Sequence, residues 1–251
     1  MRLGILDCDR LDPDLVGDFG PVYSEMFIKG FRALAPGLEF RVWSALDGEL
    51  PADLQECDAW LITGSRHDAY SDIPWIRALR DWIRRAHDAD VKLAGVCFGH
   101  QVIAQALGGE VMKSTKGWGL GVSVHPMLAR QPWMEPGLET IRILASHQDQ
   151  VEQLPPGATR LAGNDFCPNF MFLQGDHIVA IQGHPEFSVA YNRALIERRR
   201  DLLPDDRYQR SLSSLEGEVD SATMMQWLLQ FLGILPGADT AAGGITAGER
   251  T

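Results

Sequence analysis

Short apolar segments alternate with amphipathic ones along the first part of the chain. The apolar segments, each long enough for a strand, are Leu3–Leu6, Phe40–Trp43, Ala59–Ile62 and Leu93–Val96. Between them, apolar residues recur at the spacing of a helix with one buried face. This spacing is clearest in Tyr23–Leu34 and in Ile76–Ala86. The alternation predicts βαβ units, and therefore a parallel sheet that is covered by helices.

The pattern changes after Gly109, where segments of alternating apolar and polar residues begin. One such segment, Gly121–His125, is typical of a strand with one exposed face. Gly175 and the two polar residues after it predict a hairpin turn. Three further strands and two helices are expected in this part of the chain: Ile141–Leu144, Phe170–Leu173, Ile178–Ile181, Val189–Leu203 and Met224–Leu232.

The chain shows no internal repeat and no linker that would divide it. We therefore expect a single domain over residues 1–235, of the α/β class. Residues 236–251 contain glycine, alanine and polar residues with Ile245 as the one bulky apolar side chain, which predicts a flexible C-terminal tail. The charged segment from Arg193 to Arg200 is expected to be a solvated helix face.

Composition narrows the class of protein. The chain has 251 residues, of which 45% are hydrophobic and 23% are charged, which is typical of a globular protein. Its net charge of −11 disfavours binding to nucleic acid. No apolar segment approaches the ~18 residues of a membrane span. We expect no membrane association and no signal peptide.

The four cysteines, at positions 8, 57, 97 and 167, are spaced too irregularly for a disulfide framework. No two of them form a C-x-x-C pair, so a zinc ribbon is excluded and no metal site is expected. Scattered thiols are typical of a reducing compartment, which predicts a cytoplasmic location. No cofactor is expected either.

The most specific local feature is Gly95–Gln101, with the sequence GVCFGHQ, between a predicted strand and a predicted helix. Small residues two positions before and after Cys97 fit a nucleophile elbow, where larger side chains collide with the neighbouring strand and helix. The elbow brings the Cys97 thiol to the carboxyl edge of the sheet and to a helix N-terminus, which favours the reactive thiolate. A buried core cysteine between two packing glycines is the alternative interpretation.

A thiolate nucleophile needs a base, and His184 is the best placed of the seven histidines. It follows the predicted strand Ile178–Ile181 and so reaches the same edge of the sheet. Pro185 keeps His184 extended, and Glu186 then projects to the same side, where its carboxylate can orient the imidazole. A surface turn with two solvated polar groups is the alternative.

Together, the elbow and the segment Gly183–Glu186 resemble the class I glutamine amidotransferase family, whose members use a Cys-His-Glu triad. The two motifs occur in the family's order, and the β/α pattern from Leu3 to Glu186 is also similar. The resemblance implies an open, mostly parallel twisted sheet of the flavodoxin-like type, flanked by helices. It further implies Cys97 as nucleophile, His184 as general base and acid, and Glu186 as the residue that orients the imidazole.

The resemblance also implies an oxyanion hole and a substrate-binding region. The donors of the oxyanion hole would be the backbone N–H groups of Gly64, Ser65 and Phe98. The segment Lys116–Gly119 lies where the family has a glycine–aromatic turn near the pocket. The residues implied for the amino-acid end of the substrate are Gln101, Ser146, His147 and Gln148.

Two departures from the family's pattern lie near the pocket. Ser65-Arg66 stands where a Gly-Pro pair is common, and Gln148 stands where the family has glycine. The polar loop from Thr63 to Ile73 is long, and we expect it to border the mouth of the pocket. Arg66 in this loop either reads a substrate carboxylate or is solvated, and the sequence leaves both open.

Three functions fit this resemblance. The preferred one is a glutamine amidotransferase that hydrolyses the γ-amide of glutamine through a thioester on Cys97 and releases ammonia. The chain has no phosphate-binding loop, so a synthetase partner in trans is possible and the ammonia acceptor is unknown. The alternative is a γ-glutamyl peptidase that acts on glutathione-like compounds, a branch that Ile181–Phe187 and Lys116–Trp118 resemble. An inactive binding protein is a remote third possibility, disfavoured by the complete triad.

Overall fold

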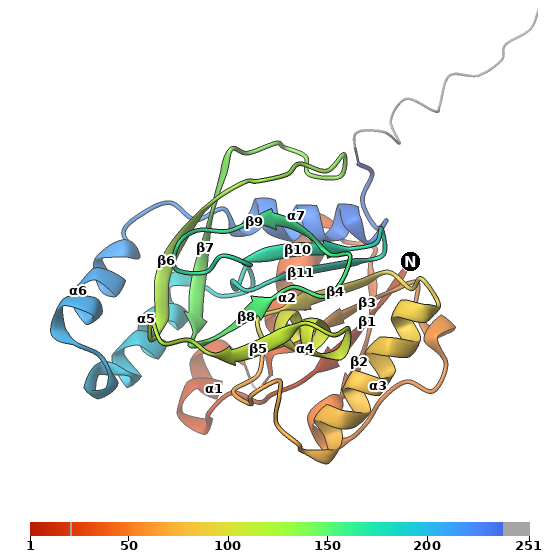
Figure 1. The fold of residues 1–251 in the computed structure, drawn as a ribbon, viewed down its shortest axis with the longest axis horizontal. Coiled ribbons are helices and arrows are strands. Elements are labelled where there is room, and N and C mark those ends of the chain that lie inside the picture. Colours follow the sequence, from red (N-terminus) through yellow and green to blue (C-terminus); the bar gives the residue numbers. More distant parts are fainter. Residues whose placement is uncertain (21, 238–251) are drawn as a thin grey trace, which may run out of the picture.

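A seven-stranded sheet lies at the centre of the computed structural model, which describes residues 1–20 and 22–237 (Figure 1). Across the sheet, the strands follow in the order β2 (Glu39–Ser44), β1 (Arg2–Asp7), β3 (Ala59–Ile62), β4 (Leu93–Val96), β11 (Ile178–Ile181), β10 (Met171–Gln174) and β9 (Thr159–Ala162). The strands from β2 to β11 run parallel, whereas β10 runs antiparallel to both of its neighbours. The sheet is open and mostly parallel, which confirms the predicted fold class.

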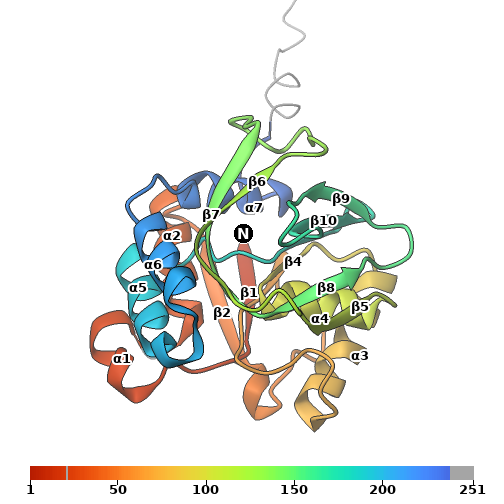
Figure 2. The same ribbon diagram turned by 60° about the vertical axis from the view of Figure 1, so that its left-hand side comes forward.

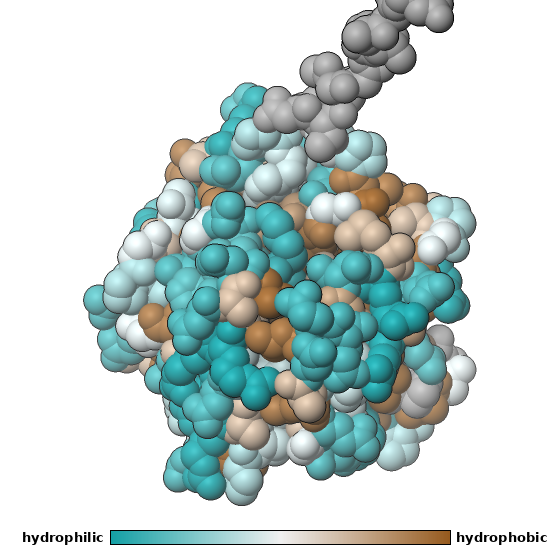
Figure 3. Space-filling model, turned by 90° about the vertical axis from the view of Figure 1, so that its right-hand side faces the viewer, coloured by the Kyte–Doolittle hydropathy of each residue, from teal (hydrophilic) through white to brown (hydrophobic). Residues whose placement is uncertain are grey.

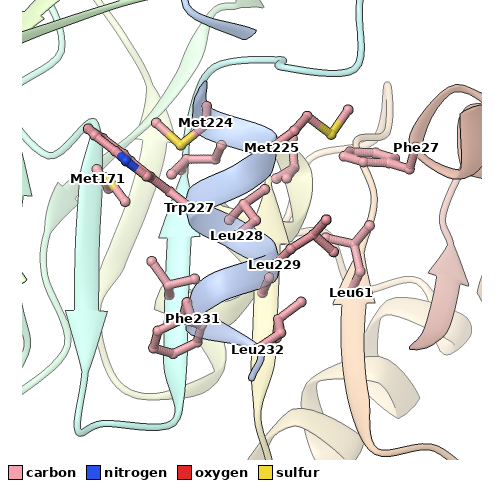
Figure 4. Close-up of a cluster of buried hydrophobic side chains, with 14 of the residues drawn as sticks. Phe27, Leu61, Met171, Met224, Met225, Trp227, Leu228, Leu229, Phe231 and Leu232 are labelled. Carbon is pink, nitrogen blue, oxygen red and sulfur yellow. The ribbon is translucent and has the colours of Figure 1, made fainter. Parts of the chain in front are cut away.

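Helices α2 (Tyr23–Leu34) and α7 (Ser221–Phe231) cover one face of the sheet (Figures 1 and 2). Figure 4 shows the buried side of α7, from which Met225 points toward Phe27 of α2 and Trp227 points the other way, toward β10. Both helices bury an apolar stripe against the strands, which stabilises them through tertiary packing.

Helices α3 (Pro74–Asp88) and α4 (Phe98–Ala106) cover the opposite face. Trp60 of β3 lies at the centre of this layer, with its ring 5.1 Å from that of Trp43 and 5.2 Å from that of Trp82. Neighbouring residues of a strand point to opposite faces, so one strand supplies side chains to both cores. The two cores hold the strand ends that carry the site in fixed positions.

The remaining elements flank the central sheet (Figures 1 and 2). Two small antiparallel sheets pair β5 with β8 and β6 with β7: β5 (Glu110–Lys113), β8 (Asp149–Gln153), β6 (Gly119–Pro126) and β7 (Thr140–His147). Three helices pack around a third apolar cluster: α1 (Pro13–Phe19), α5 (Val189–Arg198) and α6 (Asp205–Ser214). Short 3-10 helices are formed by Ala45–Asp47, Leu54–Glu56 and Arg200–Leu202. Four of the remaining elements, β5, β7, β8 and α5, bring residues to the pocket beside Cys97.

Three predicted strands have the bounds that the sequence predicts, namely β3, β4 and β11. The hairpin turn between β10 and β11 is also confirmed. The helix expected over Val189–Leu203 is shorter than predicted. It ends at Arg198, and a separate 3-10 turn follows it. The elements that the sequence pattern misses are α1, α6, β5, β8 and β9.

The C-terminal tail expected at residues 236–251 lies outside the described residues from position 238 onward. Within the described residues, no helix is long and apolar enough to cross a membrane.

Figure 3 views the molecule from the end where the parallel strands begin. Hydrophilic residues cover much of this face, and hydrophobic ones are seen in a small hollow near its middle and in a patch at the upper right.

Candidate active site

Cys97 occupies the turn between β4 and α4 with φ 54° and ψ −102°, a conformation that non-glycine residues rarely adopt. The flanking glycines make this turn possible. A Cβ at Gly95 would lie 2.7 Å from the carbonyl oxygen of Gly99, and a Cβ at Gly99 would lie 2.4 Å from the carbonyl oxygen of Ile62. The geometry is that of a nucleophile elbow, and strained backbone of this kind is concentrated at functional sites.

The thiol of Cys97 lies at the N-terminus of α4, where the helix dipole favours a negative charge. The side chain is largely buried, with 6% of the residue exposed. The Cys97 backbone N–H donates to the carbonyl of Ile181 at 2.9 Å, which ties the elbow to β11. The amide of Gln182 lies with Nε2 3.6 Å from Sγ and is oriented to donate to it.

His184 and Glu186 form a buried pair beside the elbow. His184 Nδ1 lies 2.7 Å from Glu186 Oε1, and the two side chains are 4% and 0% exposed. The His184 imidazole also stacks on the ring of Phe187 at 3.9 Å, with 7° between the planes. A carboxylate on one side and an aromatic ring across its face hold the imidazole in a single orientation.

Opposing effects set the protonation of His184. Burial lowers its pKa, but the negative charges of Cys97 and Glu186 and its hydrogen bonds to both outweigh burial and raise the pKa to about 10. The imidazole is therefore protonated at neutral pH when the thiol is ionised. The arrangement places a thiol, an imidazole and a carboxylate in the order that an activated cysteine nucleophile requires.

The residues expected to form an oxyanion hole lie around Cys97 and His184. Phe98 is the first residue of α4, so its N–H has no partner within the helix. Gly64 lies against the pair, since a Cβ there would be 3.1 Å from His184 Cε1 and 3.7 Å from Cys97 Cβ. Thr63 Oγ1 donates to the carbonyl of Gly64 at 3.1 Å, which fixes the peptide that carries the Ser65 N–H.

The residues expected to bind the substrate line one pocket with Cys97 and His184. Ser146, His147 and Gln148 contribute the end of β7 and the turn after it. Burial lowers the pKa of His147 to about 4, so its ring is neutral at pH 7. Its Nδ1, 3.1 Å from the carbonyl oxygen of Asp149, then donates there and leaves Nε2 as an acceptor.

Gln101 lines the same pocket, but its amide nitrogen already has two acceptors. Nε2 donates to the carbonyl of Asp149 at 2.9 Å and to Oε1 of Gln182 at 3.1 Å. The group that Gln101 offers to a ligand is therefore its Oε1. Gln182 stands directly before the segment Gly183–Glu186, and nothing in the sequence indicates a role for it. The structure places it as the link between Gln101 and the Cys97 thiol.

The pocket has a volume of about 430 Å³, within the range of small-molecule sites. Of the four cysteines, Cys97 alone lines it. Other lining residues come from the loop after β3, from the segment before α1 and from the end of α5: Asp9, Leu11, Asp12, Arg66, His67, Asp68, Leu195 and Arg199. Among the described residues, no group of three or more His, Cys, Asp or Glu side chains is placed to hold a metal.

Arg66 borders the pocket, as the loop's position predicts, but its guanidinium is engaged within the protein. Its Nε donates to the buried carboxylate of Asp9 at 2.9 Å, and its Nη1 donates to Asp12 at 2.7 Å. Its Nη2 donates to the backbone carbonyl of Arg10. Arg66 therefore fastens the loop to the segment before α1, and a substrate carboxylate would have to compete with Asp9 and Asp12.

One residue of the charged segment at Arg193–Arg200 differs from the solvated face that the sequence predicts. Arg198 and Arg200 are exposed and ion-paired. Arg199 instead turns into the pocket, where its guanidinium lies 4.4 Å from the ring of Trp118. Helical periodicity could not reveal this, because α5 has already ended at Arg198.

The chain matches one family over most of its length. The family model described as glutamine amidotransferase class-I matches residues 15–199, which include the elbow, His184 and Glu186. Gamma-glutamyl peptidase 3 of Arabidopsis thaliana is 32% identical over 184 residues, which make up 70% of this chain and 73% of that protein. A glutamine-hydrolysing GMP synthase subunit of Archaeoglobus fulgidus is 35% identical over 116 residues, or 44% of this chain and 63% of that protein.

Solved structures show the same architecture. A glutamine amidotransferase of Thermotoga maritima superimposes with a TM-score of 0.71 and covers 92% of this chain and 96% of its own. The two sequences are 22% identical, so this likeness concerns the fold alone.

Proposed function

Because the chain belongs to the class I glutamine amidotransferase family, a family of hydrolytic enzymes, we propose that it cleaves γ-glutamyl compounds through a thioester on Cys97, with γ-glutamyl peptides as its preferred substrates. The observation that carries this proposal is the buried Cys97–His184–Glu186 constellation at the base of an open pocket. The sequence alone favours glutamine as the substrate. The relationship to a γ-glutamyl peptidase and the size of the pocket favour a substrate with a larger leaving group.

The first half of the reaction forms the thioester. The Cys97 thiolate attacks the γ-carbonyl carbon, and the oxygen becomes an oxyanion that backbone N–H groups of Phe98 and of Gly64 or Ser65 stabilise. His184, as imidazolium, donates its proton to the leaving nitrogen, so the C–N bond breaks and the free amine departs. Glu186 stabilises the imidazolium and fixes its orientation.

The second half restores the enzyme. Neutral His184 takes a proton from water, the hydroxide attacks the thioester, and the bond to Cys97 Sγ breaks to regenerate the thiolate and release glutamate. In this scheme, Gln182 and the α4 N-terminus stabilise the thiolate as the leaving group. Reduced Cys97 is required throughout. All four cysteines are free, and we propose a cytoplasmic location because a reducing compartment keeps them so.

A second candidate function is the supply of ammonia to a synthetase. The similarity to a glutamine-hydrolysing GMP synthase subunit supports it, although that match covers less than half of this chain. The chemistry at Cys97 would be identical, with ammonia as the leaving group. Such an enzyme would need a partner protein to use the ammonia.

The two candidates differ in kcat/KM for a γ-glutamyl dipeptide and for glutamine, measured on one preparation without any partner. We expect the dipeptide to be preferred by roughly tenfold or more, which corresponds to about 1.4 kcal/mol of transition-state binding. A preference for glutamine of the same size would favour the ammonia-supplying candidate instead. The Cys97→Ala variant provides the background rate.

A further inference from the structure

Arg199 is the C-cap residue of α5 and forms part of the pocket wall. Its guanidinium stacks on the ring of Trp118 at 4.4 Å, and its Nη1 donates to the carbonyl of Leu195 at 2.9 Å. The aromatic face and the helix carbonyl hold the side chain in place and leave the other N–H donors of the fork for a ligand. Arg199 is thus a preoriented cation within the pocket.

Its two neighbours show what distinguishes Arg199. Arg198 pairs with Asp12 and Asp14, and Arg200 pairs with Asp205. Within residues 1–17, 19–20 and 22–237, Arg199 forms no ion pair with a carboxylate. Burial lowers its pKa, which means that the site disfavours an uncompensated cation. A bound carboxylate would offset this cost through a charge-assisted, bidentate pair.

The reaction itself assigns Arg199 to one half of the pocket. His184 must reach the leaving nitrogen to protonate it, so the leaving group lies on the His184 side of Cys97. The chain after His184 builds the wall on that side through Phe187, Tyr191 and Leu195, and this wall ends at Arg199. A group that extends from the leaving nitrogen therefore passes toward Arg199.

A second part of the pocket lining, around Gln101, contains carboxylates. Asp149 and Asp68 line the pocket beside Gln101 and interact with each other. Burial and the neighbouring Asp68 raise the pKa of Asp149 to about 6. Lys113 lines the pocket next to Asp149, so two carboxylates and one ammonium group meet here, and the excess of carboxylates suits the α-ammonium group of the γ-glutamyl unit. Arg199 and these carboxylates together match a substrate with an ammonium group at one end and a carboxylate at the other.

We infer that Arg199 is a specificity-determining residue, which binds the carboxylate of an amino acid or peptide leaving group and so selects γ-glutamyl peptides with a free C-terminus. The inference rests on the proposed function, because it assumes a leaving group larger than ammonia. Trp118 acts as a positioning residue for the Arg199 guanidinium.

The test compares γ-glutamyl-alanine, γ-glutamyl-alaninamide and glutamine as substrates of the wild-type enzyme and of Arg199→Gln. The wild type should prefer the acid over the amide by roughly 10- to 100-fold in kcat/KM, although the amide has the better leaving group. In Arg199→Gln, kcat/KM for the acid should fall to about the value for the amide. The values for the amide and for glutamine should stay the same as in the wild type. Arg200→Gln, which removes an exposed arginine outside the pocket, should behave as wild type.

The possible failures can be told apart. If the wild type cleaves the acid and the amide equally well, or if Arg199→Gln slows all three substrates to the same extent, the inference is wrong and the proposed function stands. If the wild type cleaves neither γ-glutamyl compound, the proposed function is wrong. Calorimetric binding of the acid and the amide to Cys97→Ala then still tests Arg199, and equal affinities would overturn its role.

Discussion

At the scale of single residues, the site depends on how three buried side chains share charge. Cys97, His184 and Glu186 lie close together, and the buried pair of His184 and Glu186 has almost no exposed surface through which water could screen it. Sequence reasoning could place these residues at one sheet edge, since each motif follows directly on a predicted strand. It could not place Gln182 against the thiol, because that contact depends on the path of the side chain.

The roles of His184 and Glu186 predict unequal effects of mutation. His184→Ala should reduce kcat by roughly 10²- to 10⁴-fold, because the proton donor and acceptor is lost. Glu186→Gln should be milder, since glutamine can still accept a hydrogen bond from Nδ1 and orient the imidazole. Steady-state kinetics on both variants, with circular dichroism to check folding, measures the difference. A larger loss at Glu186 would contradict this division of roles.

The pKa of His184 also predicts how the enzyme responds to pH. Its value of about 10 lies above the ordinary 6.5, so the stability that the charged imidazole contributes is complete below pH 6.5 and is lost as the pH rises through 10. Turnover should decline over the same upper range, because the proton donor is lost. In Glu186→Gln the decline should move to lower pH, since one of the two anions that raise the pKa is gone. Identical pH profiles of kcat for the two enzymes would show that Glu186 has no such effect.

At the scale of secondary-structure elements, unbroken apolar segments are predicted best. The strands at Ala59–Ile62 and Leu93–Val96 have the bounds expected, because burial on both faces leaves no polar position to obscure them. Short or polar elements are missed. α6 has the sequence DDRYQRSLSS with few apolar residues, and α1 is only seven residues long. Their packing around the third cluster, not their own pattern, stabilises them.

The elbow gives a prediction at this scale. Gly99→Ala should lower the free energy of unfolding by about 1–3 kcal/mol, because the new Cβ would lie 2.4 Å from the backbone oxygen of Ile62. Gly37→Ala is the matched control, since nothing lies within 4 Å of a Cβ there. Urea unfolding of both variants measures the difference. Equal stabilities would mean that the turn between β4 and α4 relaxes more easily than its packing indicates.

At the scale of the whole molecule, the net charge of −11 and the charges that line the pocket affect binding differently. The overall charge disfavours nucleic acid, whereas the pocket lining combines Arg199 with the carboxylates of Asp68 and Asp149. The strands of one sheet supply both main cores, so we propose that residues 1–235 fold as one domain.

The sequence predicted the sheet and the edge that carries the site. It could not predict which polar side chains at that edge face the pocket, because loops after β3 and α5 decide this.

The central claim, that hydrolysis proceeds through a γ-glutamyl thioester on Cys97, is tested most directly by mass spectrometry of the enzyme quenched with acid during turnover of a γ-glutamyl dipeptide. The account predicts a fraction of the protein heavier by one γ-glutamyl group, with the added mass on the peptide that contains Cys97. Cys57→Ala, which changes a cysteine outside the pocket, should show the same adduct, and Cys97→Ala should show none. An adduct on another residue, or wild-type turnover by Cys97→Ala, would contradict the account.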